Sequence, residues 1–185
     1  SVYYSTMKNL LSLAIVLIIF TSCSKQENAS PEIISIPSPV GKNASLPHLV
    51  TGENDQLYLS WIEKSDSGLV NFYYATMKDD NWSTPELIAS GNDWFVNWAD
   101  YPMIAVDKAG NMVAHYLAKS SAGTYSYDVN VRYKKADGEW QGPIIPHEDG
   151  TPTEHGFATL LPQNNGTFVL TWLDGRNTGG GEHDG

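Results

Sequence analysis

Ionisable side chains are densest in residues 147–157, HEDGTPTEHGF, which hold two histidines and three carboxylates. Such groups can bind a metal ion or carry protons in catalysis. His147 and His155 are eight residues apart and lack the His-Glu-x-x-His spacing of helical zinc sites, so a metal is not favoured and no cofactor is expected. The alternative is a metal site assembled from several loops, with Glu182–Asp184 as further ligands. Such a site would suit calcium, zinc or manganese.

The elements that must position these residues repeat along the chain. Three fifteen-residue segments align, at 47–61, 102–116 and 158–172, and they begin 55 and 56 residues apart. Each has an apolar run, a turn containing Gly, Asn or Asp, and a second apolar run that ends in an aromatic residue. Val, Tyr, Phe and Thr dominate the runs, and no helical period occurs after the N-terminal apolar stretch, so the pattern predicts strands.

Repeated units of four short antiparallel strands predict an all-β fold, namely a β-propeller of four-stranded blades. About two and a half blades fit the chain, at 46–89, 101–146 and, incomplete, 157–185. A β-sandwich is the competing architecture, but it would not require a repeat of nearly constant spacing. We therefore expect residues 46–185 to be part of a larger propeller.

The N-terminal region predicts export and attachment to a membrane. A short basic start at Met7–Asn9 precedes the apolar residues Leu10–Phe20, a stretch that is too short to span a bilayer and is typical of a signal peptide within residues 1–22. Residues 20–23, FTSC, resemble the lipobox of bacterial lipoproteins, which implies lipidation of Cys23; a secretory signal with an incidental cysteine is the alternative. Residues 23–45 then form a lipidated, flexible tether, and the protein belongs to the cell envelope, on the periplasmic face or outer surface.

The charge balance excludes some partners. The chain has a formal net charge of −10, and removal of residues 1–22, with their single lysine, leaves −11. A negative field of this size disfavours nucleic acid and anionic membrane surfaces, so the membrane contact must come from the lipid. Cys23 is the only cysteine, which excludes disulfides within the chain.

An antiparallel meander sorts the remaining loops between two ends of the sheets. Short turns such as GEND, DKAG and QNNG are predicted to lie at one end, where no chemistry is expected. Longer connections are predicted to lie at the other end, near the axis of the propeller, where binding residues usually gather. They carry Trp94, Trp98, Asp100, His147, Glu148, Asp149, Glu154, His155, Asp174 and Arg176.

Residues of these connections suit carbohydrate chemistry. Asp100, Glu154 and Asp174 are candidates for the paired carboxylates of glycoside hydrolysis, although Asp100 and Asp174 could instead cap turns. Aromatic rings can stack on the apolar faces of sugars, and the candidates are Trp94, Trp98 and Tyr101. We expect one of the two tryptophans to pack between sheets instead.

Two turns that end in tryptophan, 79–82 (DDNW) and 137–140 (DGEW), resemble the Asp-box turns of sialidase and BNR-repeat propellers. Neither keeps the full Ser-x-Asp-x-Gly-x-Thr-Trp pattern. The resemblance spans about residues 46–176 and implies a six-bladed ring with glycoside hydrolase activity. Sialidases clamp the substrate with three arginines, whereas this chain has only Arg132, expected to be structural, and Arg176, expected to bind an acidic sugar. The family's Arg-Ile-Pro motif is also missing, so sialidase activity itself does not follow.

Some propeller enzymes that act on uronic-acid polysaccharides use histidine and tyrosine. His115 is predicted at a strand end pointing toward the connections, where it could act with Tyr116 or His155. The alternative is a hydrogen-bonded structural histidine.

These observations predict a lipid-anchored protein that acts on glycans, most simply a sialidase-like glycoside hydrolase. Its catalytic candidates are Asp100, Glu154, Asp174, His115 and His155, and its substrate-binding candidates are Arg176, Trp98, Trp94 and Tyr101. The alternatives are a non-catalytic glycan-binding or scaffold propeller, and a propeller enzyme of the polysaccharide lyase type.

Overall fold

In the computed structural model, residues 30–178 are described. The predicted signal peptide, Cys23, the first part of the tether and Glu182–Asp184 lie outside these residues. The described part contains eleven strands and no helix, and adjacent strands run antiparallel within each sheet, which confirms the all-β prediction. Nothing in residues 30–178 is a helix long and apolar enough to cross a bilayer.

The first sheet comprises β1 (Ala44–Thr51), β2 (Leu57–Lys64), β3 (Val70–Lys78), β5 (Glu86–Gly91) and the short β4 (Asn81–Trp82), which pairs with the end of β3. Between β3 and β4, Asp79 and Asp80 both have positive φ angles of 48° and 58°. Two consecutive positive φ angles are typical of a tight type I′ hairpin turn, in which Asp and Asn are tolerated. The first Asp-box-like turn is thus a simple hairpin.

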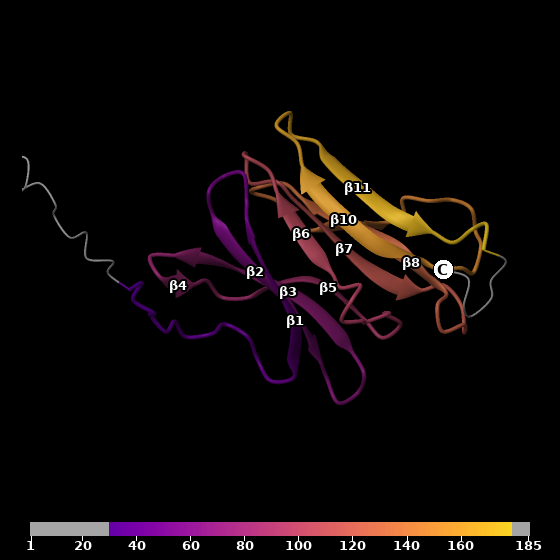
Figure 1. Cartoon of the computed structure of the whole chain (residues 1–185), viewed down its shortest axis with the longest axis horizontal. Helices are drawn as coiled ribbons and strands as arrows, with labels where there is room; N and C mark the ends of the chain where they lie inside the picture. Colours follow the sequence, from indigo (N-terminus) through magenta and orange to yellow (C-terminus); the bar gives the residue numbers. More distant parts are fainter. Residues whose placement is uncertain (1–29, 179–185) are drawn as a thin grey trace, which may run out of the picture. The chain divides into compact units, whose positions relative to one another are not determined.

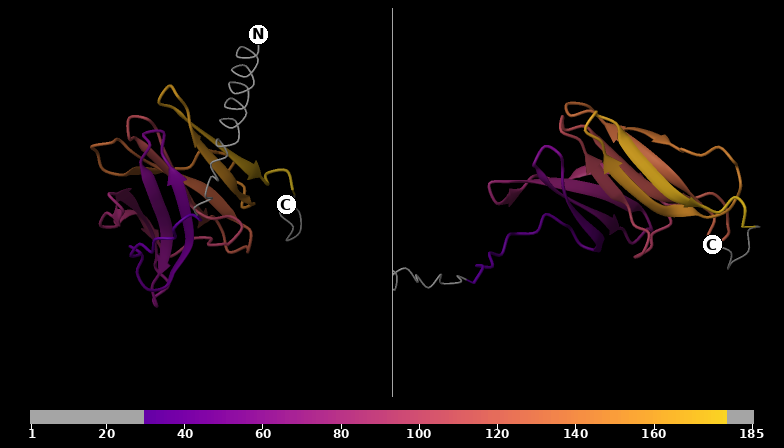
Figure 2. Two further views of the ribbon diagram at one scale, coloured as in Figure 1. Left: turned by 60° about the vertical axis from the view of Figure 1, so that its left-hand side comes forward. Right: turned by 45° about the horizontal axis from the view of Figure 1, so that its top comes forward.

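The second sheet places β6 (Met103–Val106), β7 (Met112–Lys119), β8 (Tyr127–Lys134) and β9 (Gln141–Ile144) side by side in chain order. The last two strands, β10 (His155–Pro162) and β11 (Phe168–Asp174), form a hairpin that lies beside the second sheet (Figures 1 and 2).

The three segments that align in the sequence form three hairpins with the same turn. In each turn, the N–H of the first residue donates to the carbonyl of the fifth residue. The N–H of the fourth residue donates to the carbonyl of the first. The first bond measures 2.9, 3.0 and 2.8 Å in the turns 52–56, 107–111 and 163–167. The fourth residue always has a positive φ: Asp55 at 62°, Gly110 at 85° and Gly166 at 78°. The sequence repeat is therefore a repeat of local structure.

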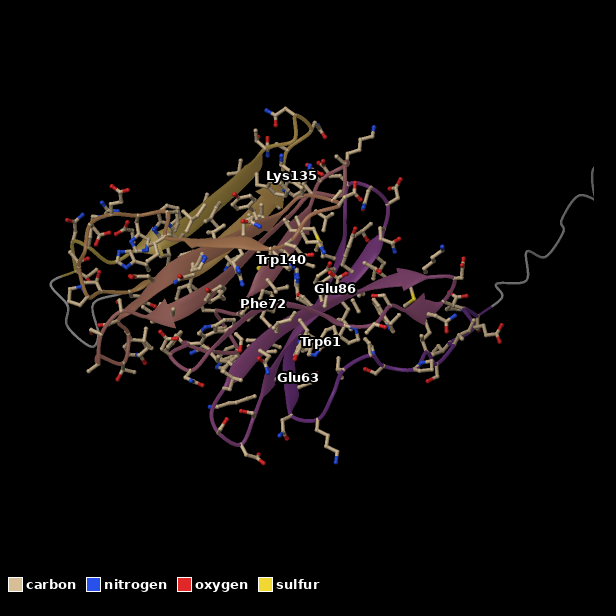
Figure 3. All side chains as sticks on the ribbon, turned by 180° about the vertical axis from the view of Figure 1, so that it is seen from behind. Trp61, Glu63, Phe72, Glu86, Lys135 and Trp140 are labelled. Carbon is tan, nitrogen blue, oxygen red and sulfur yellow. The ribbon has the colours of Figure 1, made fainter. Side chains whose placement is uncertain are left out.

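Apolar side chains fill the space between neighbouring sheets. Phe72 and Ile104 belong to the cluster between the first and second sheets, and Figure 3 shows Phe72 and Trp140 in this region. Trp140 packs edge-on against Tyr74, with ring centroids 6.1 Å apart, so the tryptophan of the second Asp-box-like turn is a packing residue. A second cluster joins the second sheet to the β10–β11 hairpin: Leu117, Tyr127, Val129 and Ala158, with Leu170 and Trp172 against it.

The loops gather at two ends of the sheets, as the meander predicts. At the turn end, comprising residues 52–56, 107–111 and 163–167, Glu53, Asp107 and Gln163 line one shallow hollow. At the connection end, comprising residues 92–102, 120–126, 145–154 and 175–178, backbone bonds tie distant segments together. Tyr127 N donates to Thr153 O at 3.3 Å, and Gly175 N donates to Glu154 O at 2.8 Å.

Candidate functional site

Two histidines of the HEDGTPTEHGF segment stack face to face at the connection end. The rings of His147 and His155 lie 3.9 Å apart and 10° from parallel. The side chain of His155 is fully buried and that of His147 is 3% exposed. The carboxylate of Asp149 lies 3.0 Å from His155 Nε2 and 3.5 Å from His147 Nδ1. A single aspartate thus contacts both rings.

Two further aspartates come from strands that the sequence places elsewhere. Asp128, in β8, puts its Oδ1 at 3.4 Å from His155 Nδ1 and 3.9 Å from His147 Nε2. Asp174, at the end of β11, puts its Oδ1 at 3.6 Å from His155 Nε2. We call Asp128, His147, Asp149, His155, Asp174 and Arg176 the histidine cluster.

Arg176 neutralises one side of this cluster. Its Nε donates to Asp174 Oδ1 at 2.8 Å and its Nη2 to Asp174 Oδ2, while Nη2 also lies 3.4 Å from Asp149 Oδ2. This two-point contact uses the fork of the guanidinium group. The hydrogen bond from Arg176 lowers the pKa of Asp174 to about 2, so that carboxylate is ionised at neutral pH.

Local turn chemistry fixes the remaining members. Asp149 accepts hydrogen bonds from the N–H and hydroxyl of Thr151, and these bonds hold the pKa of Asp149 well below its usual range. Burial lowers the pKa of His147, and charge on His155 lowers it further, against the three neighbouring aspartates. At Gly175 an added Cβ would lie 2.8 Å from Glu154 O, so only glycine permits this approach of the two segments.

Asp100 lies in a different part of the connection end. It is 4% exposed, and its Oδ2 accepts the N–H of Phe157 at 2.8 Å. Burial raises the pKa of Asp100, and the charge of Glu154 adds to this, against the stabilising bond from Phe157. Together with Tyr101, Met103 and Phe157, Asp100 lines a hollow next to β6 and β10.

Glu154 is held by a buried tyrosine. The hydroxyl of Tyr127 donates to Glu154 Oε1, and the Tyr127 ring stacks on Phe95 with centroids 4.0 Å apart. Tyr127 is 1% exposed, and burial together with this carboxylate raises its pKa far above the usual range. The side chain of Glu154 is therefore held in place by Tyr127 at the connection end.

The two tryptophans of the 92–102 connection differ in exposure. Trp94 stacks on Tyr116 with centroids 4.1 Å apart, whereas Trp98 is 83% exposed. Trp94 is thus a packing residue and Trp98 a free aromatic surface. Tyr101 lies with its ring centroid 5.9 Å from that of His48.

The placement expected for His115 is wrong. His115 lies in the middle of β7 rather than at its end, and it is fully buried. Burial and charge on His48 lower its pKa to about 4, so the ring is neutral at physiological pH. A side chain enclosed on all sides does not contact a substrate in this structure. Arg132 donates from Nη1 to Ile88 O at 2.8 Å and joins the second sheet to the first, a structural contact.

The structure thus brings Glu154, His155, Asp174 and Arg176 to one end, with Asp100 beside Phe157 of β10. Sequence reasoning missed Asp128 and Tyr127 as members of these sites. Asp128 and Tyr127 belong to an ordinary alternating strand pattern, YDVNV, which carries no signal for a site. Only the pairing of β8 with its neighbours shows their position.

No model of a known protein family matches the chain, and no curated protein sequence matches it either. What the protein does must therefore be inferred from the residues at the connection end.

Proposed function

We propose that this protein is a lipid-anchored glycoside hydrolase of the cell envelope with a sialidase-like β-propeller fold. The observation that carries the proposal is the environment of Asp100. A general acid in glycoside hydrolysis needs a carboxyl group whose pKa is raised above its ordinary value, and burial is a common cause. Asp100 is nearly buried, has a raised pKa and lines an open hollow.

The propeller architecture is supported by the repeated hairpins and by one exposed face. Each sheet packs on the next, and the three hairpins share one turn structure. The outer face of the β10–β11 hairpin leaves Leu161, Val169 and Leu173 between 44% and 62% exposed. A further sheet of the same kind would cover these side chains, as the next blade of a propeller does.

We assign the second carboxylate to Asp174, which pairs across the hairpin with His155, two residues before the Phe157 N–H that Asp100 accepts. A nucleophile or a base must be ionised, and the pKa of Asp174 is lowered to about 2. Its partner Arg176 has a side chain that is 43% exposed, which places positive charge where an acidic sugar could approach. Trp98 supplies an aromatic surface for a neighbouring sugar ring.

Turnover of sialylated and uronate-containing oligosaccharides by the full chain tests the hydrolase. Asp100→Asn keeps an oxygen for the N–H of Phe157 but cannot donate an acidic proton, so turnover should fall by roughly 10²–10⁴-fold. Asp79→Asn is the matched control, because Asp79 lies in the exposed β3–β4 turn and asparagine tolerates its positive φ. Unchanged turnover in Asp100→Asn contradicts the assignment.

Non-catalytic glycan binding is the second candidate, and the exposed Trp98 favours it. Stacking alone requires no acid. If the chain retains an oligosaccharide without turnover, and Trp98→Ala abolishes retention while Asp100→Asn does not, the protein is a binding module.

Lipid attachment is proposed from the sequence alone. Cells grown with a labelled fatty acid should yield labelled protein from the natural sequence and unlabelled protein from Cys23→Ala. Label in the Cys23→Ala protein contradicts attachment at that residue.

A further inference from the structure

Two nitrogen atoms in the histidine cluster are buried and have no hydrogen-bond partner within residues 30–178: His147 Nε2 and His155 Nδ1. Burying a polar atom without a partner is costly, and such atoms need an explanation. Both nitrogens lie near one oxygen, Asp128 Oδ1, at 3.9 and 3.4 Å.

The contacts of the other two ring nitrogens, His155 Nε2 and His147 Nδ1, indicate which nitrogen of each ring carries the N–H proton. Asp149 Oδ2 lies 3.0 Å from His155 Nε2 and 3.5 Å from His147 Nδ1. An ionised carboxylate only accepts, and Asp149 lies nearer to each ring than Asp128 does, so Asp149 favours the tautomers with a proton on those two atoms. In these neutral tautomers, His155 Nδ1 and His147 Nε2 each carry a lone pair.

Two lone pairs and a carboxylate oxygen therefore face one point, an arrangement that repels itself unless a cation occupies the point. Asp128, His147 and His155 each offer one ligand atom, and the three ligand atoms lie within 4.8 Å of one another. Zinc–nitrogen bonds of about 2.0–2.1 Å in tetrahedral geometry separate ligand atoms by roughly 3.4 Å. The observed separations of 3.4 and 3.9 Å are close to this value.

We propose that Asp128, His147 and His155 bind one divalent transition-metal ion of the zinc class. Imidazole with carboxylate is a ligand set that suits such ions. The two ring planes are nearly parallel and their centroids lie 3.9 Å apart, so one ion cannot lie in both planes; binding therefore turns the rings relative to each other. Asp128, His147 and Glu148 line an open hollow, which leaves the fourth position to water.

Asp149 is a positioning residue in this proposal. Metal-bound histidines usually donate their other N–H to a carboxylate, which fixes the ring and its tautomer. Asp149, His155 and Asp174 form a second group with closely spaced ligand atoms, but Arg176 already neutralises its carboxylates. The metal is therefore assigned to the Asp128 side.

The site would act as a clip between segments that are far apart in the sequence. Asp128 is the second residue of β8 in the second sheet, His147 lies in the connection between β9 and β10, and His155 is the first residue of β10. The assignment does not rest on the proposed hydrolase, because no step of it uses Asp100 or a sugar.

Calorimetric titration of the chelator-treated full chain with Zn²⁺ tests the site, with Co²⁺ absorption as a second readout. We expect one ion per chain and visible Co²⁺ bands typical of four-coordinate geometry. Asp128→Asn and His147→Gln should each weaken Zn²⁺ binding by about a hundredfold or more, and Asp149→Asn by roughly tenfold. Circular dichroism confirms that each variant still folds.

His48→Gln is the control, because His48 lies in β1 and contacts Tyr101 rather than the cluster. Its binding should equal that of the natural sequence. Absence of Zn²⁺ binding, or binding that survives both Asp128→Asn and His147→Gln, overturns the proposal. Loss of binding only in His183→Gln overturns it too, since His183 lies outside the proposed ligands.

Discussion

The turn end and the connection end of the sheets are built from the same types of polar residue but satisfy them differently. At the turn end, Asp107 Oδ1 accepts the N–H groups of Ala109 and Asn111 at 2.9 and 2.8 Å, all within five residues of chain. At the connection end, Asp128 faces histidines 19 and 27 residues away. The first arrangement is local, and the second depends on how the second sheet and the β10–β11 hairpin pack.

This difference suggests that polar residues at the turn end serve mainly the stability of the fold, whereas those at the connection end are available to a ligand. Turn residues that satisfy one another lower the free energy of the folded chain and have little left to offer a ligand. Groups that packing leaves without partners carry a cost, and such costs are common at functional sites. Predictions that change one end and compare it with the rest test this division.

The largest expected effect is a loss of stability in acid, caused by the buried His115 in the second of the repeated hairpins. The pKa of His115 is lowered from 6.5 to about 4, so between these values the unfolded chain takes up a proton that the folded chain refuses. The contribution of His115 to the free energy of unfolding is fully present above pH 6.5. It falls by about 3 kcal/mol as the pH drops toward 4. His115→Met should remove most of this pH dependence in denaturant unfolding measured from pH 7 to pH 4.

The same experiment compares the buried middle of β7 with the connection end. His147→Gln should leave most of the acid dependence in place. If it removes the dependence and His115→Met does not, the connection end limits acid stability and the division is wrong.

A smaller loss is expected from Asp107→Ala at the turn end. Asp107 is 1% exposed, and besides the two backbone N–H groups its carboxylate accepts a hydrogen bond from Asn111 Nδ2 at 2.7 Å. Removing it leaves three donors without an acceptor and should cost about 2 kcal/mol of unfolding free energy. Asn165→Ala in the third turn, where the lost bonds are exposed, should cost about 0.5 kcal/mol. Equal losses would mean that burial does not set the cost.

The smallest effect on stability is expected at the connection end. Asp174 and Arg176 are paired but exposed, and exposed ion pairs contribute little because water and salt screen them. Asp174→Asn should shift the unfolding midpoint by less than about a quarter of the Asp107→Ala shift. A shift as large as that of Asp107→Ala would make Asp174 a structural residue and argue against its proposed catalytic role.

The hairpins and turns were predictable because their causes are short-ranged. Alternating apolar residues predict strands, and Asp, Asn and Gly supply the positive φ angles that the turns require. The sorting of loops between two ends also followed, since an antiparallel meander leaves no other choice. By contrast, the burial of His115 was not predictable, because its position in β7 does not reveal what packs over it.

The sequence by itself determined an all-β chain with three alike hairpins and a cluster of ionisable groups in one connection. Only the tertiary structure decided that His147 and His155 stack beside Asp128, that Arg176 is paired with Asp174, and that Trp98 rather than Trp94 is exposed. The physical reason is range. Turn and strand preferences act over a few residues, whereas exposure and polar pairing depend on which distant surfaces the packed sheets bring together.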